Sequence, residues 1–171
     1  MSNPVTVVGL DESPSSRAAL RWAAEHSLLT RGVVRAVHVL DWPYGLDAAD
    51  VADPGSAGKL LTHHDIEDLY RSRIIRIFDE VNPRPDWLVQ FAYGEVGPML
   101  VRQAEHAGLL VVGTREHVGL GRLLAGSVSH YCLSHSPCPV VAVPAASPWA
   151  RHAPAARPDG TSTSSTAPAH R

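Results

Sequence analysis

The segment VTVVGLDESPSSRAALRWAAEHSLLTRGVVRAVHVL, residues 5–40, carries the strongest structural signal in the chain. It opens with the apolar run Val5 to Val8 and then a glycine, which is typical of a strand that is buried on both faces and ends in a sharp turn. Ser13 suits a helix N-cap with proline in the first helical position, and Gly32 suits the C-terminal cap. The β-branched residues within 33–40 predict a second strand. Together these signals predict a strand, a helix and a second, parallel strand.

The same alternation of apolar strands and amphipathic helices continues to residue 144. The elements predicted there are a helix over 66–81, a strand over 87–93, a helix from 97 to about 108, a strand over 109–112, a short helix over 127–135 and a strand over 140–143. Strands that alternate with helices in this way favour an α/β fold, in which a parallel sheet is covered on both faces and joined by right-handed crossovers.

Composition divides the chain into one folded domain and a tail. With 171 residues, 44% of them hydrophobic, the chain suits a single domain with one core, which we assign to residues 1–144. Residues 145–171 are rich in Ala, Pro, Ser and Thr with almost no large apolar side chains, so we expect a disordered tail. The polar segment 41–58 contains prolines, glycines and aspartates and predicts a long surface loop.

Charge and hydropathy argue against several classes of protein. Fifteen Lys and Arg against seventeen Asp and Glu give a formal charge of -2, without the basic surplus of a nucleic-acid binder. No run approaches the roughly 18 apolar residues of a membrane span, and the first residues lack the pattern of a cleaved signal, so we expect a cytoplasmic protein. Cys132 and Cys138 lack C-x-x-C spacing, and the ten histidines form no ligand cluster, which predicts ordinary small or buried cysteines and no metal site.

Ligands of open parallel sheets bind beyond the carboxyl ends of the strands, where the strand order reverses. In this chain Gly9 and Asp11 follow the first strand, and Gly113 ends the fourth, so we expect these two loops to meet above the sheet. The Asp11 carboxylate can accept hydrogen bonds from ribose hydroxyls or from a base amine. Capping of the helix that follows Ser13 is an alternative role for the same side chain.

Four glycines within the segment 113–127 form a glycine-rich loop after the fourth strand. Gly126 and Ser127 directly precede a predicted helix, where free backbone N–H groups and the positive end of the helix dipole favour a phosphate. Glycine is also the default residue of ordinary turns, so the loop by itself is weak support for a ligand. The sequence G-x-x-x-x-G-K-(S or T) of an ordinary P-loop is absent, and no G-x-G-x-x-G follows the first strand.

Two blocks of the chain resemble the universal stress protein family. They are VVGLDESPSSRAALRWA, residues 7–23, and VVGTREHVGLGRLLAGSVSHYCLSHSPCPVVAVP, residues 111–144. Between them, the pair His38-Val39 and the turn from Gly94 to Pro98 occur in the order that the family shows. The resemblance implies a flavodoxin-like, doubly wound sheet of five parallel strands, usually in a homodimer, with ATP bound in one branch of the family and not in another.

The ATP-binding branch of the family carries the motif G-x2-G-x9-G-(S or T). Gly113 matches the first glycine, and Gly126 with Ser127 matches the end, with the nine residues 117–125 correctly placed before them. The contacts that the resemblance implies are Asp11 and the backbone of Val39 at the adenine, Gly9 at the ribose, and Gly113, Gly126, Ser127 and Val128 at the phosphates. The pattern names no catalytic base.

Glu116 stands where the motif has its middle glycine. A left-handed backbone at a non-glycine residue costs on the order of 1 kcal/mol. A carboxylate about 6 Å from one phosphate charge costs roughly 3 kcal/mol at an effective dielectric constant of about 20, and less where solvent screens it. Together these effects are expected to weaken ATP binding by about one to two orders of magnitude. Arg115 and Arg122 leave segment 113–127 with a net charge of +1, and magnesium bridging Glu116 to phosphate would offset the penalty further.

The sequence thus predicts a dimeric stress-response protein that binds ATP or AMP and acts as a switch read by a protein partner, with any ATP hydrolysis slow and incidental. The dimer contact is expected along the last strand, Val140 to Val143, because an apolar edge invites pairing. A binding or scaffolding module that has lost nucleotide is the alternative, and Glu116 is the reason for it. An adenylating enzyme is disfavoured because G-L-D-E-S-P, and not S-G-G-x-D-S, follows the first strand.

Overall fold

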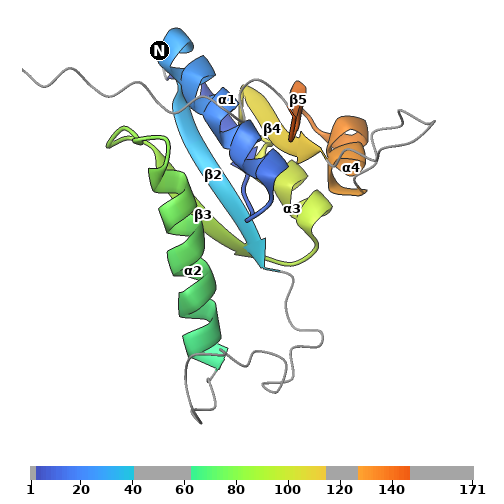
Figure 1. Cartoon of the computed structure of the whole chain (residues 1–171). Coiled ribbons are helices and arrows are strands. Elements are labelled where there is room, and N and C mark those ends of the chain that lie inside the picture. The colour runs from blue at the N-terminus through green and yellow to red at the C-terminus, as the bar shows by residue number, and fades with distance from the viewer. Residues whose placement is uncertain (1–2, 41–62, 115–126, 147–171) are drawn as a thin grey trace, which may run out of the picture.

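The computed structural model describes residues 3–40, 63–114 and 127–146 (Figure 1). In chain order, the elements within these ranges are β1 (Val5–Gly9), α1 (Pro14–Thr30), β2 (Val33–Leu40), α2 (His63–Asp79), β3 (Leu88–Tyr93), α3 (Val96–Gln103), β4 (Leu109–Thr114), α4 (Ser127–His135) and β5 (Val140–Pro144). Each predicted strand and helix is therefore present. The predicted loop over 41–58, and residues 147–171 of the predicted tail, lie outside the described residues.

All five strands lie parallel in one sheet, in the order β3-β2-β1-β4-β5. Helices α1 and α2 contribute to a core cluster on one face of the sheet, and α3 and α4 contribute to a second cluster on the other face (Figure 1). The predicted flavodoxin-like, doubly wound sheet of five parallel strands is confirmed. Because two cores sandwich the sheet, the central strands are apolar on both sides, which explains their uninterrupted hydrophobic runs.

Helix α1 begins as its sequence predicts and ends differently. The Ser13 hydroxyl accepts a hydrogen bond from the Ser16 N–H at 3.2 Å, and proline follows in the first turn. At the other end Arg31, with φ of 56°, takes the left-handed position, so the prediction of Gly32 as the cap is wrong. Gly32 instead packs against the Pro4 carbonyl, where a Cβ would come within 2.8 Å of the oxygen. Close packing, and not a left-handed backbone, accounts for this glycine.

Helix α3 is shorter than predicted, because it ends at Gln103 and a turn follows. The Gly108 N–H donates to the Val5 carbonyl at 2.9 Å, so the chain has already joined the sheet at the residue where the helix was expected to end. None of the helices in the described ranges combines the length and the apolar character that crossing a membrane requires.

The reversal of strand order lies between β1 and β4. The chain leaves β1 toward α1 on one face of the sheet and leaves β4 toward α4 on the other face. The chain therefore turns to opposite faces of the sheet after these two adjacent strands, and such a switch point is where ligands of parallel sheets bind. The strand β2 extends past the end of β1, since the paired register of the two strands stops at Gly9 and Val37 while β2 continues to Leu40.

Candidate functional site

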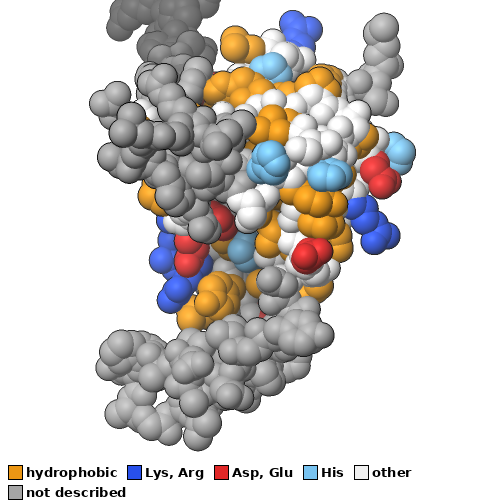
Figure 2. All heavy atoms as spheres, turned by 90° about the vertical axis from the view of Figure 1, so that its right-hand side faces the viewer, with side chains coloured by type: hydrophobic (Ala, Val, Ile, Leu, Met, Phe, Trp, Pro, Cys, Tyr) orange, Lys and Arg blue, Asp and Glu red, His pale blue; other side chains and the backbone are white. Residues whose placement is uncertain are grey.

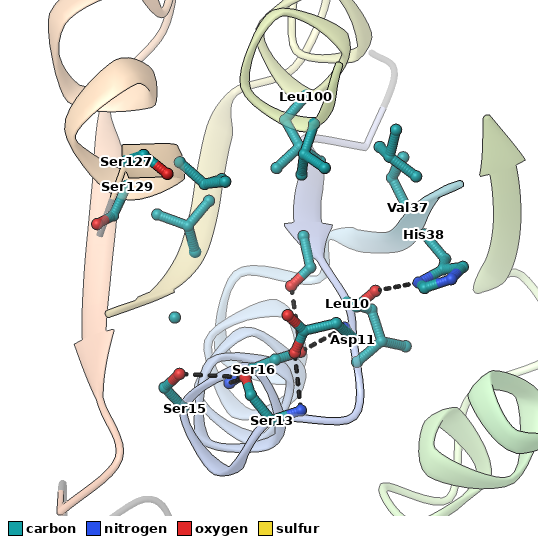
Figure 3. Close-up of a pocket in the computed structure, with 16 residues that line it drawn as sticks. Leu10, Asp11, Ser13, Ser15, Ser16, Val37, His38, Leu100, Ser127 and Ser129 are labelled. Carbon is teal, nitrogen blue, oxygen red and sulfur yellow. Dashed lines mark hydrogen bonds between the residues drawn. The ribbon is translucent and has the colours of Figure 1, made fainter. Parts of the chain in front are cut away.

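A cavity of about 200 Å³ opens at the carboxyl ends of β1, β2 and β4 (Figure 3). Its walls come from the loop after β1, the first turn of α1, the end of β2, helix α3 and the first turn of α4. Six of the seven residues predicted to contact a nucleotide line it: Gly9, Asp11, Val39, Gly113, Ser127 and Val128. The seventh, Gly126, lies outside the described residues, as does Glu116.

Hydrogen bonds hold the loop between β1 and α1 in one conformation. The Asp11 carboxylate accepts from the Ser13 N–H at 2.8 Å, and the Asp11 N–H donates to the Ser16 hydroxyl oxygen at 2.7 Å. The Ser16 hydroxyl in turn donates to the Gly9 carbonyl at 3.4 Å. Asp11 therefore supports the helix start, as the alternative reading of the sequence held, and it also lines the cavity (Figure 3). One carboxylate oxygen accepts from the Ser13 N–H, which leaves the exposed carboxylate able to accept a further hydrogen bond.

Two helix N-termini meet at the cavity. The first turn of α1 contributes Ser13, Ser15 and Ser16 to its wall, and the first turn of α4 contributes Ser127 and Ser129. Figure 3 shows Ser127 on the side of α4 that faces the cavity, and this residue is exposed. Backbone N–H groups in a first turn lack partners within their helix, and the helix dipole adds positive potential. The two helix starts together provide a setting for an anion.

Gly113 brings the end of β4 against α1. A Cβ on this residue would lie 2.6 Å from the Ser15 carbonyl carbon and 2.6 Å from the Ser16 nitrogen, both of them backbone atoms. No side chain fits there without moving the helix. The motif glycine thus has a packing role inside the protein, in addition to the phosphate contact that the resemblance implies, because it sets the distance between β4 and the first turn of α1.

The end of β2 presents a peptide edge to the cavity. The Leu10 N–H donates to the Val37 carbonyl at 2.9 Å, so the peptide groups of Val37 face β1. Alternate residues of a strand face the same neighbour, and Val39 therefore turns its N–H and C=O to the same side. The register between β1 and β2 ends at Gly9 and Val37, so β1 does not cover this edge. Val39 lines the cavity with a hydrogen-bond donor and an acceptor side by side.

Apolar side chains close the cavity opposite these polar groups. Leu100 and Val96 come from α3, Val112 from β4 and Val37 from β2. Leu100 is 2% exposed and belongs to the core cluster on that face of the sheet. A rigid apolar wall beside a few polar groups is typical of small-molecule sites, in which apolar contact gives affinity and the polar groups give orientation.

Several lining residues were not predicted from the sequence. The α3 residues Leu100 and Val96 gave no signal, because only the strand order places α3 beside this end of the sheet. His38 appeared only as half of a family pair, although its Nδ1 bonds to the Leu10 carbonyl at 2.8 Å. Ser13 was predicted as the helix cap, but nothing in the sequence indicated that Ser13, Ser15 and Ser16 reach the cavity. Among the described residues, no three His, Cys, Asp or Glu side chains come together in a way that could hold a metal ion.

Comparison with known proteins agrees with this arrangement. The family model described as the universal stress protein family matches residues 5–144. A universal stress protein of Mycolicibacterium smegmatis is 31% identical over 144 residues, which cover 80% of this chain and 47% of the relative. A universal stress protein of Mycobacterium tuberculosis is 30% identical over 145 residues, with 80% and 46% covered. The chain thus spans about half the length of the curated relatives it matches.

Solved structures share the fold. The universal stress protein of Archaeoglobus fulgidus in complex with dAMP superimposes with a TM-score of 0.53 at 21% identity, over 82% of this chain and 97% of that one. A universal stress protein family protein of Arabidopsis thaliana with AMP bound gives a TM-score of 0.52 at 17% identity, over 82% and 91%. These likenesses match the doubly wound sheet, and the family model covers the whole of it. The chain belongs to the universal stress protein family.

Proposed function

We propose that this protein binds an adenine nucleotide, AMP or ATP, in the cavity between β1 and β4, and that the bound nucleotide sets the state of a dimer that a protein partner reads. The observation that carries the proposal is the meeting of three features at one cavity: the Val39 peptide edge, the Asp11 carboxylate and two helix N-termini. The dAMP and AMP complexes of its structural relatives support the choice of ligand.

Each part of an adenine nucleotide has a counterpart in the wall of the cavity. Adenine offers an acceptor at N1 beside a donor at N6, which complements the N–H and C=O of Val39. Asp11 accepts from a ribose hydroxyl or from the base amine. The start of α4 at Ser127 receives the phosphate. The apolar wall around Leu100 packs against the flat base and the ribose.

We propose a binding role without catalysis. Among the described residues that line the cavity, the titratable side chains are Asp11 and His38, and each already holds a hydrogen bond to the backbone. These two bonds shape the site, and we propose a nucleotide-binding switch in the cytoplasm as the role of the protein.

Isothermal titration calorimetry with AMP and ATP tests the proposal on the purified, folded chain. The variant Ser127→Glu keeps the helix start favourable, because a carboxylate suits the positive end of the dipole, but it repels phosphate. We expect Ser127→Glu to bind AMP about tenfold or more weakly than Ser127→Gln, the matched variant of nearly the same size that carries no charge. Absence of a heat signal at millimolar AMP and ATP, with the protein folded, would overturn the proposal.

Glu116 is the reason to propose a second role as the alternative. If its carboxylate prevents nucleotide binding, the same fold serves as an interaction module, and the side of the molecule that carries α4 and β5 is the surface to consider. Figure 2 shows hydrophobic side chains lying among histidines on this side. Exposed Leu133 on α4 and the partly exposed edge residues Val140 to Ala142 belong to it. The Glu116 variant described in the Discussion separates the two roles.

A further inference from the structure

The structure assigns to His38 a positioning role: its imidazole donates a hydrogen bond to the Leu10 carbonyl, in place of the Val39 N–H, and so leaves the Val39 N–H available to a ligand. The inference deepens the proposed nucleotide site and rests on it for its functional meaning. Its structural part concerns the protein without nucleotide and can be tested separately.

The hydrogen-bond ladder of β1 and β2 stops one step early. The last bond of the ladder is the one that the Leu10 N–H donates to the Val37 carbonyl at 2.9 Å. The next bond of a parallel ladder would join the Leu10 carbonyl to the Val39 N–H. The paired register nevertheless ends at Gly9 and Val37, and that carbonyl accepts from His38 Nδ1 at 2.8 Å instead (Figure 3).

The chemistry of the bond fixes the proton on the imidazole. A carbonyl oxygen only accepts, so Nδ1 of His38 carries the hydrogen and donates it. Leu10 is 3% exposed, and both of its backbone groups bond to β2. Its N–H donates to the Val37 carbonyl, and its carbonyl accepts from the His38 side chain. Without a donor at position 38, the Leu10 carbonyl would be a buried acceptor in need of a partner. The Val39 N–H lies next in the ladder and would supply it.

The His38 ring is held from β3 and α2. It meets the Phe91 ring edge-on, with the ring centres 5.9 Å apart and the planes at 75°. The Arg71 guanidinium lies over Phe91 at 4.4 Å from the ring centre and is itself bound by the Glu67 carboxylate at 2.6 and 2.8 Å. These contacts fix the ring direction, so Nδ1 stays on the Leu10 carbonyl. The peptide edge of Val39 is therefore kept open by side chains from two other elements.

Two amide variants of His38 provide a matched test. In His38→Asn the side-chain nitrogen takes the place of Nδ1 and can still donate to Leu10, whereas in His38→Gln it takes the place of Nε2 and cannot. His38→Leu removes the donor altogether. His106→Leu, at an exposed histidine outside the cavity, controls for the loss of an imidazole.

Amide hydrogen exchange by NMR, on the full chain without nucleotide, reports the ladder directly. We expect the Val39 amide of the wild type, His38→Asn and His106→Leu to exchange faster than that of Val37. In His38→Gln and His38→Leu the exchange of the Val39 amide should slow by about tenfold, the effect of one added hydrogen bond, and AMP should bind about tenfold more weakly.

Equal Val39 exchange in the wild type and both donor-free variants would overturn the role of His38. A wild type that binds no AMP, but shows the expected exchange pattern, would refute the proposed function and leave the role of His38 standing. If one donor-free variant fails to fold, the other decides the outcome.

Discussion

At the scale of single residues, Glu116 bears most on nucleotide affinity. It replaces the middle glycine of the motif that Gly113, Gly126 and Ser127 otherwise complete. We expect Glu116→Gly to strengthen ATP binding by about ten to one hundredfold, because it restores the motif glycine and removes a negative charge from the segment that the motif assigns to the phosphates. AMP should gain less, since it carries a single phosphate. Calorimetry with both nucleotides measures the difference. An ATP affinity unchanged by the substitution would show that Glu116 is no barrier and would remove the reason for the alternative role.

Gly113 is the residue at which packing and site geometry coincide. A Cβ there would lie 2.6 Å from backbone atoms of Ser15 and Ser16, so Gly113→Ala must displace α1 or the end of β4. We expect a loss of about 1 to 3 kcal/mol in the free energy of unfolding, the usual cost of overpacking. Urea denaturation measures this loss. Gly108→Ala is the matched control, because its Cβ would meet its nearest atoms at 3.7 Å. Similar losses in both variants would argue against the packing role of Gly113.

The two cysteines should differ in reactivity. Burial raises the pKa of the Cys132 thiol to about 11, so it stays protonated near neutral pH, whereas Cys138 is only partly buried. We expect a thiol reagent at pH 8 to modify Cys138 first and to reach Cys132 only after unfolding. Mass spectrometry of the labelled peptides distinguishes the two sites. Rapid labelling of Cys132 in the folded protein would contradict its place in the core.

At the scale of elements, β5 is an edge strand of the sheet, and no other described strand pairs with its outer row of backbone groups. The Leu110 N–H donates to the Pro139 carbonyl, so residues 139 and 141 face β4, while Val140 and Ala142 point their N–H groups outward. We expect Ala142→Pro to break a dimer formed along this edge and to preserve the monomer, because proline is tolerated where the N–H faces solvent. Native mass spectrometry measures the oligomeric state, with Ala142→Val as the control that keeps the N–H. A dimer that survives Ala142→Pro would place the contact elsewhere.

Most elements could be predicted because their signals are local. The apolar runs of β1 and β4 and the cap at Ser13 depend on neighbours in sequence alone. The end of α1 was mispredicted because Gly32 is required by contact with Pro4, a residue distant in sequence. The residues Leu100 and His38 were missed in the same way, since their roles depend on which strands and helices become neighbours.

At the scale of the whole molecule, the site follows from the reversal of strand order. Adjacent strands β1 and β4 send their helices to opposite faces, and their carboxyl ends open between α1 and α4. A general rule for parallel sheets was enough to predict that Asp11 and Gly113 meet there. The rule does not give the register of β2, which extends past β1 and adds the Val39 peptide to the cavity. Backbone groups carry no signature in sequence, so the resemblance alone pointed to this contact.

Chemical-shift mapping by NMR tests most directly whether this cavity is the nucleotide site. Spectra of ¹⁵N-labelled protein are recorded as AMP is added, and the amides that move are located in the fold. We predict that the largest changes fall on Gly9 to Asp11, Val39, Gly113 and Ser127 to Ser129, which line the cavity from four elements. Changes confined to another surface, or none at millimolar AMP, would contradict the proposed site.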